Sequence, residues 1–93
     1  MTTTRDIEIA FDGALDQVTR AAATEWAKEL GQQLGQLEFR LRAERAKALE
    51  RGTVDPDWVR TTVRWVVEWV PESDLTIIAA VGRIARLSPG GLS

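Results

Sequence analysis

The sequence predicts an all-α fold in which one long helix packs against two shorter ones. Three observations support this: a proline-free stretch over residues 14–51, a strong helix start at residue 55, and apolar residues at helical spacing. A chain of 93 residues is long enough for a single small domain. We therefore expect one domain over residues 1–93, with an N-terminal segment over residues 1–12 and a flexible tail over residues 89–93.

The N-terminal segment fits two structures. Residues 7–11 alternate apolar and polar side chains, as a half-buried strand does. Ile7, Phe11, Leu15 and Val18 also fit one stripe of a helix. Asp12-Gly13 follows as a turn signal, so the segment is either a short strand or helical.

The long helix is expected over residues 14–51. Apolar side chains recur there at steps of three and four: Trp26, Leu30, Leu34, Leu37 and Leu41. Gly52 follows a basic last turn and predicts the stop. Such a helix would be about 57 Å long, so a kink or break near Gly31–Gly35 is an alternative. No proline lies in this glycine-containing stretch, which favours a continuous or merely kinked helix.

The next helix is expected over residues 55–70. Asp55 can cap it, Pro56 suits its first position, and Asp57 suits its first turn. Placed at about 100° per residue, its polar side chains occupy one arc and its valines and tryptophans the rest. A strand is the alternative because β-branched residues are frequent, but the cap and the separated polar arc favour a helix.

The last helix is expected over residues 73–88, joined to its predecessor at Pro71. Its apolar side contains Ile77, Ala80, Val81, Ile84 and Leu87. The two shorter helices, laid end to end, are nearly as long as the first helix. The predicted arrangement is therefore three helices, with the second half of the chain folded back along the first.

The sequence offers one candidate surface for binding another protein. Trp58, Trp65 and Trp69 lie side by side on the predicted helix over residues 55–70, next to its valines. Either this helix is packed between the other two, or its valines face the core and the tryptophans bind a partner. A helix lying on a membrane surface is a third alternative, but two acids balance two arginines on the polar arc and disfavour membrane binding. Phe39 lies about 180° from the leucine stripe of the long helix. This position indicates either a change of register near Gly35 or a second contact surface.

A second candidate surface is basic. It consists of Arg40, Arg42, Arg45, Lys47 and Arg51, interleaved with glutamates. Binding of nucleic acid through this stretch is the alternative function. Ion pairs within one helix, such as Glu38–Arg42 and Arg40–Glu44, also account for the pattern, and the net charge of −2 disfavours nucleic acid.

Composition excludes several kinds of chemistry. The chain has no Cys, His or Tyr, which removes zinc sites built on Cys or His, Cys or Ser–His nucleophiles and a His proton shuttle. It also has no Gly-rich phosphate loop and no Ser in a nucleophile elbow. We therefore expect no enzyme activity, metal site, cofactor or small-molecule substrate. Acidic residues near the N-terminus argue against a signal peptide, and no apolar stretch approaches the roughly 20 residues of a membrane span. Abundant Arg and Ala suggest a bacterial source. We expect a cytoplasmic, non-enzymatic adaptor or accessory subunit that docks through its Trp/Val helix, as an oligomer or with a partner protein.

Overall fold

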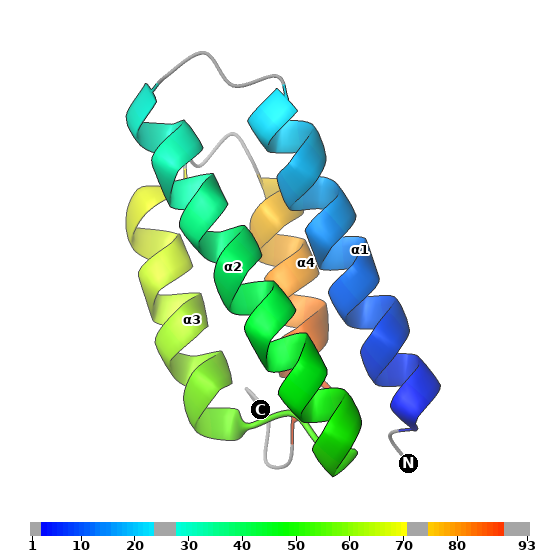
Figure 1. Ribbon diagram of the computed structural model, residues 1–93. Coiled ribbons are helices and arrows are strands. Elements are labelled where there is room, and N and C mark those ends of the chain that lie inside the picture. Colours follow the sequence, from blue (N-terminus) through cyan, green and yellow to red (C-terminus); the bar gives the residue numbers. More distant parts are fainter. Residues whose placement is uncertain (1–2, 24–27, 71–74, 89–93) are drawn as a thin grey trace.

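A computed structural model describes residues 3–23, 28–70 and 75–88. These residues form four helices: α1 (Thr4–Ala23), α2 (Lys28–Arg51), α3 (Pro56–Trp69) and α4 (Leu75–Ala85). Successive helices run up and down in turn, with α2 between α1 and α3, and α4 behind them (Figure 1). The fold is a four-helix bundle. The all-α prediction is confirmed, whereas the three-helix arrangement is wrong.

The first predicted helix is two helices. Residues 24–27 between α1 and α2 lie outside the described residues, as does Trp26 of the predicted stripe. Gly31 and Gly35 both lie within α2, so the helix does not break there. A single helix would leave the apolar stripe of α1 without a partner. Packing α1 back against α2 buries both stripes.

Residues 7–11 are helical and belong to α1. The helical spacing, and not the strand-like alternation, matches the observed burial. All four residues of the helical stripe are buried: Ile7, Phe11, Leu15 and Val18. A capping box fixes the start: the Thr3 hydroxyl accepts from the Asp6 N–H, and the Thr3 N–H donates to the Asp6 carboxylate. The bonds from Thr3 lower the pKa of Asp6 and so favour its charged form. The alternative strand over residues 7–11 is therefore not found in the described residues.

The turn between α2 and α3 follows its sequence signals. Gly52 has a positive φ of 79°, and its N–H donates to the Ala48 carbonyl at 2.7 Å. The Asp57 N–H donates to the Asp55 side chain at 2.9 Å, which confirms Asp55 as the cap and Pro56 as the first helical residue. Residues 56–69 are therefore helical, as predicted.

The helix α4 buries the side chains expected of it. Ile77, Ala80, Val81 and Ile84 are buried, and Leu87, just beyond the helix, is half-buried. The predicted junction at Pro71 and the predicted tail over residues 89–93 lie outside the described residues. The core of the bundle also joins α1 to α3, since the rings of Phe11 and Trp58 lie 5.8 Å apart.

Alanine substitutions at two glycines are expected to change the free energy of unfolding in opposite directions. Gly35 is inside α2, and a Cβ there would meet nothing within 4 Å. Gly35→Ala should therefore raise the free energy of unfolding by about 0.5–1 kcal/mol. Gly52→Ala should lower it by about 1 kcal/mol, because the positive φ at Gly52 strains any side chain. Urea unfolding measures both, and changes of the same sign would contradict this account.

Candidate functional site

Phe39 is the most exposed of the large apolar side chains in the described residues, at 74%. It lies on the outer face of α2, opposite the buried Leu34, Leu37 and Leu41. Because leucines on both sides of Gly35 are buried on the same side of one helix, the register does not change there. The predicted change of register is therefore not found, and Phe39 is exposed on the outer face of α2.

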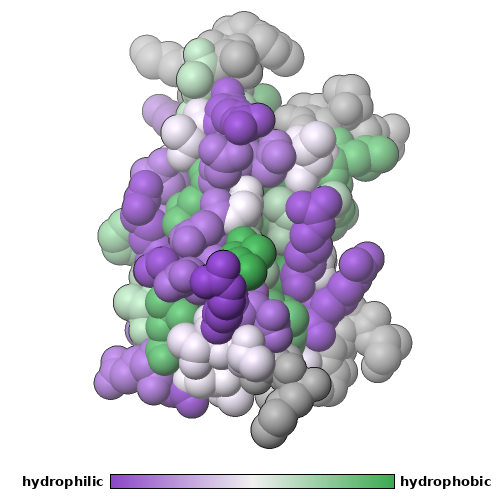
Figure 2. Space-filling view, turned by 90° about the vertical axis from the view of Figure 1, so that its right-hand side faces the viewer, coloured by the Kyte–Doolittle hydropathy of each residue, from purple (hydrophilic) through white to green (hydrophobic). Residues whose placement is uncertain are grey.

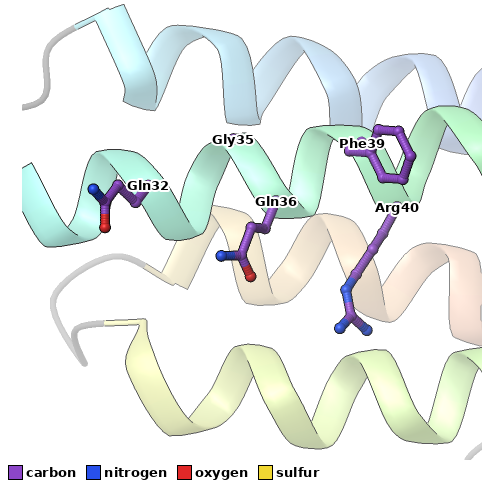
Figure 3. Close-up of a pocket in the computed structure, with 5 residues that line it drawn as sticks. All are labelled: Gln32, Gly35, Gln36, Phe39 and Arg40. Carbon is purple, nitrogen blue, oxygen red and sulfur yellow. The ribbon is translucent and has the colours of Figure 1, made fainter.

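A shallow depression lies beside Phe39. Its lining comes entirely from α2: Gln32, Gly35, Gln36, Phe39 and Arg40. The side chains of Gln32, Gln36 and Arg40 extend from α2 toward α3, and the Phe39 ring does not follow them (Figure 3). Because Gly35 has no side chain, the outer surface of α2 is recessed at this position. We call Phe39 and this depression the Phe39 surface.

The three predicted docking tryptophans are half-buried and pack against the core of their own chain. Trp58 contacts Phe11 in the interior. Trp65 and Trp69 pack edge to face at 5.2 Å, and the Arg40 guanidinium lies 4.4 Å from the centre of the Trp65 ring. Much of their aromatic area therefore joins α3 to its neighbours.

The core face of α3 is formed by other residues. Val59, Thr62 and Val66 are buried, while Val67 is 57% exposed on the opposite side from the tryptophans. The hydroxyl of Thr62 and the indole nitrogen of Trp69 are buried without a hydrogen-bond partner. The sequence predicted that the valines and tryptophans share the apolar part of this helix. It did not show that the tryptophan flank of that apolar part meets α2.

Most side chains of the predicted basic stretch form ion pairs or ring contacts within the bundle. Arg42 pairs with Glu38 at 3.6 Å, as predicted. Arg45 pairs with Asp12 at 2.9 Å and Glu8 at 3.7 Å, which ties α2 to α1. The predicted Arg40–Glu44 pair is wrong, since Arg40 stacks on Trp65 and the buried Glu44 binds Arg51 at 2.8 Å. Lys47 is exposed.

The side of the bundle formed by α1 is mostly hydrophilic, with smaller apolar areas between the polar side chains (Figure 2). Ile9 is 57% exposed there and lines a groove between α1 and α4. Asp6 and Arg83 also line this groove and introduce opposite charges. The sequence analysis did not predict this groove. The available signal was Ile9, an apolar residue that lies outside the buried helical stripe starting at Ile7.

Comparisons with protein-family models, curated proteins and solved structures find no match to this chain. Among the described residues, no group of three or more acidic side chains could hold a metal ion. No helix in the described part of the chain is long and apolar enough to cross a membrane.

Proposed function

We propose that this protein is a small, non-enzymatic interaction protein, an adaptor or accessory subunit that docks through its helices. The observation that carries the proposal is the 74% exposure of Phe39 on a helix whose opposite side already fills the core. Its exposed ring contributes little to the fold of its own chain. Aromatic side chains, Phe included, are enriched in the buried centre of protein–protein interfaces.

The docking surface is centred on Phe39, with Trp65 and Trp69 at its α3 edge. Arg40 links the two parts, since it lines the depression and also lies over the Trp65 ring. Trp58, whose ring lies 5.8 Å from that of Phe11, is assigned to the core of the bundle and not to this surface. Of the four residues predicted to bind a partner, we therefore keep Phe39, Trp65 and Trp69 on the docking surface.

Binding of nucleic acid through Arg40, Arg42, Arg45, Lys47 and Arg51 has less support. Carboxylates of the same chain partly neutralise Arg42, Arg45 and Arg51. A protein that binds phosphates loses affinity steeply as salt rises, whereas apolar docking responds little. We therefore expect the affinity of this protein for its partner to change little as the salt concentration rises.

Photo-cross-linking tests the proposal. A benzophenone amino acid replaces Gln36, which is exposed beside Phe39. In extracts of the source cell we expect a discrete protein adduct, and we expect Phe39→Ser to abolish it. The matched control carries the same probe at Thr61, which is exposed on the polar side of α3. Identical adducts from both positions, or adducts unaffected by Phe39→Ser, would reject the proposal.

A further inference from the structure

We propose that the partner of the Phe39 surface is a second copy of this chain, paired through antiparallel α2 helices. Each Phe39 then lies against Gly35 of the other copy. This inference rests on the proposed function, because it names the occupant of the same surface.

The shape of the surface is complementary to itself. Phe39 projects from α2 and is 74% exposed, while a Cβ at Gly35 would meet nothing within 4 Å. The two positions are one helical turn apart, about 6 Å along the axis. A two-fold axis near residue 37 brings each Phe39 to the partner's Gly35, so both contacts form at once. A partner of unrelated sequence would need either the projection or the depression, whereas a second copy uses both.

The charge of the surface permits pairing with itself. Gln32 and Gln36 are neutral, and each amide can both donate and accept hydrogen bonds. Glu38 and Arg42 form an ion pair at 3.6 Å, with no net charge. The cation of Arg40 extends toward α3 and stacks on Trp65 (Figure 3). Two copies therefore meet without the excess of like charge that would oppose association.

The area of the surface predicts how strong the dimer is. A stable protein interface buries about 1,200–2,000 Å² in total, and one face of a single helix with one aromatic side chain provides less. We therefore infer a weak, reversible dimer. Its formation should depend on Phe39 more than on any other exposed apolar residue, because aromatic anchors dominate small interfaces.

Sedimentation velocity tests the dimer. Between about 10 µM and 1 mM, the mean mass of the full chain should rise from one chain toward two. Phe39→Ser and Gly35→Gln should each raise the dissociation constant about tenfold or more. Gly35→Gln keeps the helix, since nothing obstructs a side chain there. The control is Val67→Ser, which removes a 57% exposed apolar side chain from α3 and should leave the mass unchanged.

Disulfide formation tests the orientation. The chain has no cysteine, so a single introduced thiol can form a disulfide only with its own copy. In the antiparallel pair, residue 36 lies near its counterpart across the two-fold axis, whereas a parallel pair moves the two apart. Gln36→Cys should therefore yield a covalent dimer on mild oxidation. Thr61→Cys on α3 should not.

Three outcomes would overturn the inference: a mass of one chain at every concentration, a dimer insensitive to Phe39→Ser, or a dimer that Gln36→Cys fails to link. A single-chain mass combined with a Phe39-dependent adduct to a different protein would reject the dimer and retain the proposed function. A single-chain mass with no adduct would reject both.

Discussion

Phe11→Ala is expected to lower the free energy of unfolding by about 3–5 kcal/mol, the largest effect of any substitution considered for this protein. The Phe11 side chain is fully buried, and its ring lies 5.8 Å from that of Trp58. Its removal leaves a cavity in the core, beside the Trp58 ring. Domains of this size are stable by about 5–15 kcal/mol in total, so the variant should be close to unfolding.

Urea unfolding followed by tryptophan fluorescence measures this loss. The control is Ile9→Ala on the same helix, where the side chain is 57% exposed and the change should stay within about 0.5 kcal/mol. Equal losses in the two variants would contradict the placement of Phe11 at the centre of the bundle.

Glu44→Ala is expected to lower the free energy of unfolding by about 1–3 kcal/mol. The carboxylate of Glu44 is buried in the C-terminal half of α2. It accepts from the Arg51 guanidinium at 2.8 Å and from the Asp55 N–H at 3.4 Å. These two bonds hold the turn that leads into α3. Alanine would leave the donors without their acceptor.

Two further variants make this prediction specific. Glu44→Gln keeps the shape and an acceptor oxygen, so it should cost less than Glu44→Ala. Glu50→Ala removes an exposed glutamate from the same helix and should have almost no effect. Equal stabilities of Glu44→Ala and wild type in urea would show that the buried carboxylate does not hold the turn.

The strongest local signals in the sequence were sufficient to predict parts of the fold. Some residues determine the structure at their own positions: Asp55 caps a helix, Pro56 fixes φ, and Gly52 adopts a left-handed conformation. These are local properties of the chain. The buried stripe of α4 followed from helical spacing alone. Local chemistry determined these features, and so they were predictable.

The division into α1 and α2 was not predictable from local signals. The four residues between these helices, Thr24 to Ala27, include neither proline nor glycine. Gly31 and Gly35, which looked like the weak point, are accommodated within α2. Tertiary burial determines the division, because the stripe from Ile7 to Val18 requires a neighbouring helix to cover it.

The candidate site was predictable in part. The position of Phe39 opposite the leucines followed from angle alone, and its exposure agrees. The tryptophans of α3 were ambiguous because an apolar arc does not reveal which flank faces a neighbouring helix. Only the packing of α3 beside α2 shows that Trp65 stacks against Arg40.

The central claim is that Phe39 serves contact with another molecule and not the core of its own chain. The free energy of unfolding of Phe39→Ser, measured in urea at low micromolar concentration, tests it most directly. We predict a value within about 0.5 kcal/mol of wild type, as for other exposed positions. A loss of about 2 kcal/mol or more would place Phe39 among the core residues and contradict the claim.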